Sequence, residues 1–348
     1  MKNNAESVMK VIAIYVVGIA FSLFNIWGLI RLYGDINLIW ISAAGLPLLS
    51  ILFAVLHELG HLAVAKIGRF EIIKFSVLCF SYDKRKKRRF SLSFSRNNLG
   101  ETIFIPKKIS IREGENASVF INIALGGLIV SVVCCIIFAA LFIVISNAYA
   151  RSILACFPIT LAFLALNGIN SVFHDSDASV IRSLSDFSSV TCFDGYLNVL
   201  TGLRHGKTYG EIDEQYFCGH CGIGSVNDAM RLFAMRRYEE LGDYPAARNV
   251  IDELSVADID GSAEVQAEIA CVAYLSGDDE LFNKYSVVIK RLDGINEPFA
   301  ERARIAAAKK RGDIDYIKIA IKTAVKSCDE EFFTGDGKFN KIIIERLS

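Results

Sequence analysis

The sequence has no net charge, because its 38 lysine and arginine residues are matched by 38 aspartate and glutamate residues. An overall basic field, which would attract nucleic acid, is therefore missing, and we expect no nucleic-acid partner. Charge is also scarce locally, since residues 1–180 contain nearly all of the long uncharged runs. Residues 200–348 have the composition of an ordinary soluble protein, so the change near 180–200 predicts two domains.

The nine cysteines lack the spacing of a disulfide framework. Cys134, Cys135 and Cys156 lie in apolar runs, where a thiol acts as a small hydrophobic group. The scattered thiols of the polar half suit a reducing compartment. Cys218 and Cys221 form one CxxC pair, but no second Cys or His pair follows at the spacing of a zinc finger. We interpret this pair as unligated thiols, with a structural metal site as the alternative.

Four apolar runs are long enough to cross a lipid bilayer as helices, which takes about 20 residues. They cover about 11–30, 36–66, 117–146 and 152–173. The first run is too long for the apolar core of a cleavable signal peptide. Between the second and third runs, residues 67–116 form a polar insert, where alternating apolar and polar residues predict short strands at Phe75–Leu78 and Phe90–Phe94.

Basic residues indicate how the spans are oriented. The insert carries six consecutive basic residues at Lys84–Arg89, whereas the short loops at 31–35 and 147–151 carry one each. Because basic loops stay on the cytosolic side, we expect the insert and both termini in the cytosol. The basic run is then expected to anchor the insert on anionic headgroups of the lipid bilayer.

The second span contains the sequence His-Glu-Leu-Gly-His at residues 57–61. Residues four apart on a helix share a face, so His57 and His61 can direct their imidazoles at one metal ion. Glu58 is adjacent and can act as general base toward water that zinc activates. Such groups are costly in lipid, so an ionisable cluster inside a span indicates function. The pattern predicts a zinc site that needs a third protein ligand.

The end of the fourth span offers candidates for this third ligand. In the expected orientation it reaches the cytosolic face near residues 167–177, at a depth similar to that of residues 57–61. Asp175 and Asp177 carry oxygen ligands that zinc accepts, and His174 is a further candidate. Alternatively, the two aspartates only end the span at the water interface. The residues alone leave this choice open.

Three separated segments resemble the site-2 protease family of intramembrane zinc metallopeptidases. Residues 57–61 match the family's HExxH motif in a transmembrane helix, and the small residues at 124–129 are similar to its Gly-Pro segment. Asn170 with Asp177 resembles its late Asn…Asp-Gly motif. The chain departs from that motif at Phe173, where the family usually has proline, and at Ala178, where glycine is usual.

The resemblance implies that His57, His61 and Asp177 bind Zn²⁺, that Glu58 activates water, and that Asn170 orients or stabilises the reacting peptide. The substrate would be a membrane protein or peptide, cut in or near a transmembrane segment. The resemblance also implies a multi-pass protein of the bacterial plasma membrane, with its active site on the cytosolic side. The two departures motivate an alternative, a catalytically impaired membrane regulator or scaffold that keeps the protease fold.

The polar half contains a repeated Gly–Asp pair, which begins at Gly242, Gly277 and Gly312 and so recurs every 35 residues. Each pair stands between two segments with helical patterning. A period near 34 resembles the tetratricopeptide helix–turn–helix, whose neighbouring units stack into a solenoid. Such a surface could bind a cytosolic protein partner, or the domain could only cap and stabilise the chain.

Taken together, these patterns predict an all-α, polytopic membrane protein with about four transmembrane helices. A transmembrane metalloprotease domain is expected at residues 1–185, with the β-rich cytosolic insert inside it. A soluble, tetratricopeptide-like helical-repeat domain is expected at residues 186–348.

Overall fold

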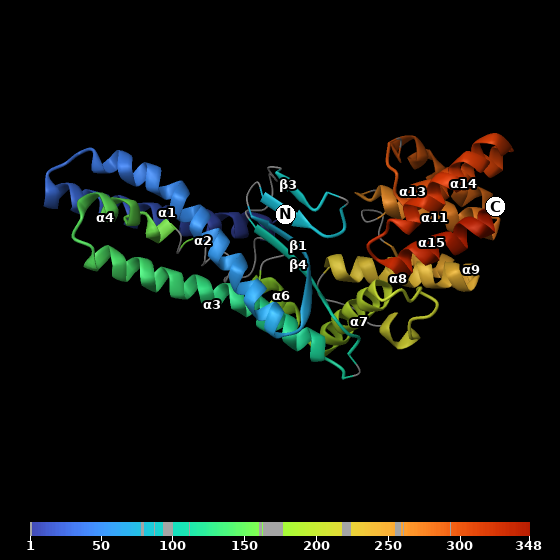
Figure 1. Ribbon diagram of the computed structural model, residues 1–348, viewed down its shortest axis with the longest axis horizontal. Helices are drawn as coiled ribbons and strands as arrows, with labels where there is room; N and C mark the ends of the chain where they lie inside the picture. Colours follow the sequence, from blue (N-terminus) through green and yellow to red (C-terminus); the bar gives the residue numbers. More distant parts are fainter. Residues whose placement is uncertain are drawn as a thin grey trace. The chain divides into compact units, whose positions relative to one another are not determined.

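The computed structural model describes residues 2–77, 80–86, 88–92, 100–110, 112–159, 162, 177–217, 224–254, 259, 261–292 and 294–348 (Figure 1). Within these residues the fold is mostly helical and includes a small antiparallel sheet. The chain divides into two compact units. The first comprises residues 1–105 and 115–186, and the second comprises residues 106–114 and 187–348.

Three helices of the first unit are long and apolar enough to cross a membrane. They are α1 (Lys2–Tyr33), α2 (Leu38–Ile67) and α3 (Glu115–Val144). Large apolar side chains point outward from all three helices, such as Phe24, Trp40 and Ile136. A helix that is apolar around its whole circumference suits a lipid environment better than water. Three of the four predicted spans therefore correspond to helices of the required length.

The fourth predicted span, at 152–173, lies largely outside the described residues. Its beginning is seen in α4 (Ala148–Leu154), where Asn147 caps the helix by accepting a hydrogen bond from the Ala150 amide at 3.0 Å. After the gap, the chain is described again from α6 (Asp177–Ser183).

Helices α2 and α3 approach each other closely because glycines face each other between them. A Cβ atom on Gly60 would lie 2.6 Å from the Gly126 carbonyl oxygen, and one on Gly126 would lie 2.6 Å from Val64 Cγ2. Small residues allow helix backbones to approach in this way, particularly where both helices are apolar. The small-residue segment at 124–129 thus has a packing role between the two helices.

A four-stranded sheet follows α2 directly. Its strands are β1 (Phe70–Val77), β2 (Phe80–Asp83), β3 (Phe90–Leu92) and β4 (Gly100–Pro106), in the order β3-β2-β1-β4. The pairs β1–β2 and β2–β3 are antiparallel, with Lys74 opposite Asp83 and Phe80 opposite Leu92. The two short strands expected from alternation correspond to parts of β1 and β3.

The second unit is built from helices and two 3₁₀ segments. In chain order these are α7 (Phe187–Arg204), η1 (Glu214–Phe217), α8 (Gly224–Leu241), α9 (Tyr244–Glu253), α11 (Ala263–Ser276), α12 (Asp279–Tyr285), η2 (Ser286–Leu292), α13 (Pro298–Arg311), α14 (Ile314–Asp329) and α15 (Thr334–Leu347). Consecutive helices pack against each other in three pairs, which are α8–α9, α11–α12 and α13–α14. Helix α11 also packs against α13.

Each Gly–Asp pair of the repeat lies between the two helices of one of these pairs. The glycines have φ between 74° and 76°, a left-handed conformation that favours glycine at a helix end. The following aspartate caps the next helix by accepting a hydrogen bond from the amide three residues later. One residue therefore ends a helix and the next begins another, which makes the turn tight. The residues are Gly242–Asp243, Gly277–Asp278 and Gly312–Asp313.

Buried ion pairs connect the first helices of these pairs. Arg302 of α13 contacts Glu239 of α8 at 3.1 Å and also bonds Glu268 of α11, and none of these three side chains is exposed. Arg236 of α8 contacts the same Glu268 at 2.6 Å. Burial raises the pKa of Glu239, although the positive charge of Arg302 acts to lower it. Charges thus join α8, α11 and α13, which we call the inner helices, and apolar side chains also pack between α11 and α13.

Candidate metal centre

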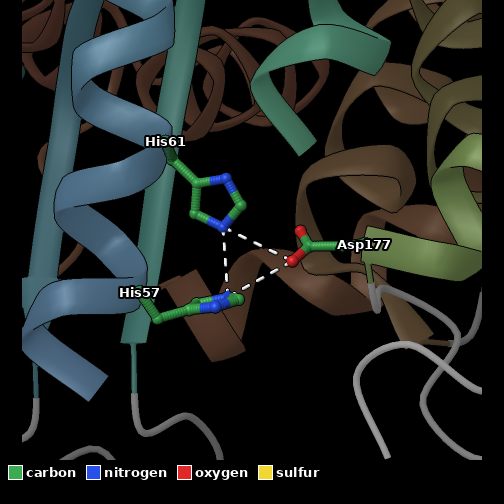
Figure 2. Close-up of side chains that lie close together, drawn as sticks. All are labelled: His57, His61 and Asp177. Carbon is green, nitrogen blue, oxygen red and sulfur yellow. Dashed lines mark hydrogen bonds and ion pairs between the residues drawn. The ribbon is translucent and has the colours of Figure 1, made fainter. Parts of the chain in front are cut away.

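The three predicted residues of the 57–61 segment lie together on α2, and their side chains are buried. His57, Glu58 and His61 are 5%, 7% and 6% exposed, although imidazole and carboxylate groups ordinarily stay in water. Figure 2 shows the two imidazoles on successive turns of the helix, with their Nε2 atoms facing the same point. These two nitrogen atoms lie 3.2 Å apart.

Asp177, the first residue of α6, brings a carboxylate to the same point (Figure 2). Its Oδ2 atom lies 3.2 Å from His57 Nε2 and 3.4 Å from His61 Nε2. Burial acts to raise the pKa of the Asp177 carboxyl, but the hydrogen bonds and charges of the two imidazoles lower it to about 2. The carboxylate is therefore ionised at neutral pH, which is the form that binds a cation.

The spacing of these three atoms fits a divalent metal ion. A tetrahedral zinc ion with bonds of about 2.0–2.1 Å holds its ligand atoms about 3.3 Å apart. The three separations of 3.2, 3.2 and 3.4 Å agree with that value. Two imidazoles and one carboxylate suit zinc and several other divalent ions. A metal ion could therefore be held by three residues together, which we call the metal group: His57, His61 and Asp177.

The other ring nitrogen of each histidine has a hydrogen-bond partner in α3. His61 Nδ1 lies 2.7 Å from the carbonyl oxygen of Ile123 in α3. A carbonyl only accepts hydrogen bonds, so Nδ1 carries a proton, and in the neutral ring Nε2 then keeps its lone pair for a cation. His57 Nδ1 lies 2.7 Å from the hydroxyl of Ser131, about two helical turns further along α3. Helix α3 thus orients both imidazoles.

Gly127 of α3 makes the room for the His61 ring. A Cβ atom on Gly127 would overlap the ring atoms of His61, including Nε2. Any larger residue here would displace the imidazole from its position beside Asp177. The glycine pair at 126–127 therefore serves two purposes, since Gly126 permits the helix contact and Gly127 permits the histidine conformation.

Glu58 is hydrogen-bonded to the sheet and not to the two histidines. Its Oε2 atom accepts a hydrogen bond from the hydroxyl of Thr102 in β4. Neither Thr102 nor Ser131 was singled out from the sequence. Ser131 does carry a signal in the sequence, because a polar side chain in an apolar run needs a hydrogen-bond partner. Thr102 carries no such signal, because a threonine in a strand is ordinary.

Several predicted residues fall outside the described part of the chain. Asn170 is one of them, as are His174 and Asp175, the two competitors of Asp177 for the third position. The CxxC pair at Cys218 and Cys221 also lies outside. Six described cysteines are buried and form no disulfide, at positions 134, 135, 156, 192, 271 and 328. The burial of Cys134, Cys135 and Cys156 agrees with their expected role as small hydrophobic groups.

Comparison of the chain with protein-family models, with curated proteins and with solved structures gives no match. Its function has to be inferred from its own residues. The group formed by His57, His61 and Asp177, with Glu58 beside it, is the most specific chemical feature of the described residues.

Proposed function

We propose that the protein is a zinc-dependent intramembrane endopeptidase of the site-2 protease type. The observation that supports this most is the convergence of His57, His61 and Asp177 beside Glu58, in a helix that is long and apolar enough to span a membrane. Residues 57 and 177 are separated by most of the first unit, so their meeting is a property of the tertiary fold. A cluster of this kind among apolar helices is costly unless it has a function.

Each residue of the site has its own proposed role in peptide hydrolysis. A zinc ion held by the three ligands would supply Lewis-acid activation of water and of the peptide carbonyl. The Glu58 carboxylate accepts the proton of the attacking water and donates it to the leaving amide nitrogen. Ser131 and the Ile123 carbonyl keep the two imidazoles in place. Asn170 is proposed to orient the reacting peptide.

The apolar helices indicate where the substrate would be. The site lies on α2 and α3, two helices that are long and apolar enough to cross a membrane, so its substrate would be the transmembrane segment of another protein or a membrane-bound peptide. The basic run at 84–89 favours a cytosolic position for the sheet, both termini and the active site. The membrane is proposed to be a bacterial plasma membrane. The helical pairs of the second unit would offer a surface to the cytosolic part of the substrate or to a protein partner.

The test compares wild-type protein with Glu58→Gln in a membrane of stated lipid composition. The amide keeps the size of the carboxylate but cannot accept the proton, so cleavage is expected to fall by at least about 100-fold. Bound zinc is measured on both proteins by elemental analysis and is expected at one ion per chain in each. Candidate substrates come from the membrane stubs that accumulate in cells carrying the Glu58→Gln protein.

Three outcomes of this experiment separate the hypotheses. Equal cleavage by the two proteins would contradict the role of Glu58. Bound zinc without cleavage by either protein, and without accumulating stubs, would favour the regulator that keeps the protease fold. Wild-type protein without stoichiometric zinc would overturn the metal centre itself.

A further inference from the structure

We infer that Thr102 is a positioning residue, which holds the Glu58 carboxylate in the orientation needed for proton transfer. This inference rests on the proposed function. Thr102 Oγ1 donates a hydrogen bond to Glu58 Oε2, and Glu58 is almost fully buried. A buried carboxylate without a donor is costly, so this bond determines how the side chain is oriented. Among the residues that the structure describes, no other side chain donates to Glu58.

The fold explains how a strand far along the chain reaches this helix. Glu58 lies about 13 Å before the end of α2 along the helix axis, at 1.5 Å per residue. A tight turn at Gly68 and Arg69 follows the helix, and Arg69 adopts a left-handed φ of 60°. The turn starts β1 at once, so the sheet runs back beside the last turns of α2. Strand β4 is hydrogen-bonded next to β1 and brings Thr102 to the level of Glu58.

Strand β4 is itself fixed in position on both sides of Thr102. The preceding residue, Glu101, forms an ion pair with Lys74 of β1 and accepts a hydrogen bond from the Ser76 hydroxyl through its carbonyl at 3.4 Å. Further along the strand, the side chains of Phe104 and Ile105 are buried. Thr102 is thus anchored to the sheet, and the sheet in turn continues α2. The Thr102 hydroxyl can therefore act as a fixed reference point for Glu58.

Such an anchor matters for a general base more than for a metal ligand. A displacement of about 1 Å of a reacting group can lower a rate by about 100-fold, even when every group is present. Valine has the shape of threonine but no hydroxyl, so Thr102→Val would leave Glu58 buried and free to rotate. Serine keeps the hydroxyl and loses only the methyl group. The two variants separate the hydrogen bond from packing.

The experiment measures kcat, KM and zinc affinity of full-length protein in lipid nanodiscs, with a substrate that the wild-type protein cleaves. For Thr102→Val we expect kcat to fall by about 10–100-fold with KM unchanged within about twofold. For Thr102→Ser we expect most of the activity to return. Zinc affinity, measured by competition with a chromogenic chelator, is expected to remain at the wild-type value in both variants.

Ser131→Ala serves as the matched control, because this hydroxyl contacts a histidine of the metal group and not Glu58. Loss of such a contact typically weakens metal binding by about 10–100-fold. Wild-type zinc affinity for Thr102→Val, beside a weakened affinity for Ser131→Ala, would separate positioning of the base from integrity of the metal site.

Three results would overturn the role of Thr102 and leave the proposed function standing. The first is undiminished kcat for Thr102→Val, and the second is an equal loss of activity in Thr102→Ser, which would assign the effect to packing. The third is weakened zinc binding by Thr102→Val, since the residue would then support the metal site. Absence of cleavage by the wild-type protein would overturn the proposed function, and this inference with it.

Discussion

The two histidines of the metal group depend on the residues behind them as much as on each other. Each imidazole has one nitrogen directed at Asp177 and the other at α3. Because the contact to α3 fixes the rotation of the ring, a change in α3 alters the metal group without touching a ligand. Gly127 is the most exacting of these positions, since the ring of His61 occupies the space of its missing side chain.

Gly127→Ala should therefore impair metal binding. The added methyl group overlaps the His61 ring, which is also held by the Ile123 carbonyl and cannot turn away without losing that bond. We expect zinc affinity to fall by at least about tenfold, measured by chelator competition on protein in nanodiscs. Gly28→Ala is the control, because a Cβ atom there meets no atom within 4 Å. Wild-type affinity in Gly127→Ala would contradict this account of the histidine geometry.

Among the elements, the inner helices of the second unit are joined by charges that have no access to water. Arg302 of α13 faces two carboxylates, and within the described residues the carboxylate of Glu239 hydrogen-bonds only to Arg302. The Glu239 Oε1 atom and the Arg302 Nε atom have no hydrogen-bond partner in the described structure. A buried network of this kind contributes little net stability. Removing one partner is nevertheless strongly destabilising, because the remaining charge stays buried without a partner.

Removing one member of this network should destabilise the second unit strongly. For Arg302→Met we expect a loss of about 3–5 kcal/mol in the free energy of unfolding, since Glu239 and Glu268 lose their shared partner. Adding Glu239→Leu should recover part of that loss, because one uncompensated carboxylate disappears. Arg248→Met provides the control, since its ion pairs are exposed and worth at most about 1 kcal/mol.

Chemical denaturation of the full chain, followed by hydrogen exchange in α8, α11 and α13, measures these effects. A stability of Arg302→Met equal to that of Arg248→Met would show that the buried charges do not hold the helices together. Failure of the double variant to recover any stability would indicate that packing around Arg302, and not the charge of Glu239, is responsible.

Over the whole molecule, each of the two compact units has a hydrophobic core of its own. In the first unit, residues such as Leu49, Phe53 and Phe138 form a cluster between the long helices. In the second unit, residues such as Ala267 and Leu292 form a separate cluster. The metal group belongs entirely to the first unit. Metal binding should therefore stabilise one unit and not the other.

Metal removal tests this division. A ligand that binds only the folded state adds stability to the part of the chain that holds it. Chelation of zinc should therefore increase amide hydrogen exchange in α2, α3 and α6, measured by mass spectrometry. Exchange in α8 to α15 should stay unchanged. The variant His57→Ala should reproduce the chelated pattern with zinc present, and an equal increase in both units would contradict the expected independence.

Local features of the sequence were sufficient for most of the elements. Apolar runs longer than 20 residues predict long helices wherever they occur, because a helix satisfies its own backbone hydrogen bonds without neighbours. The Gly–Asp pairs predict tight turns because the left-handed conformation and the cap are properties of those residues themselves. The spacing of His57 and His61 likewise predicts a shared face from helix geometry alone.

What the sequence by itself determined was therefore the helical character, the long apolar runs and the two histidines with their glutamate. Only the tertiary structure decided which residues meet them. Asp177 joins the histidines, Ser131 and Gly127 shape their surroundings, and Thr102 holds Glu58 from a strand. The physical reason is that these contacts depend on how α2, α3, α6 and the sheet pack together, and packing leaves no periodic signal in the chain. The buried Arg302 network escaped prediction for the same reason, since a lone arginine in a helix ordinarily faces water.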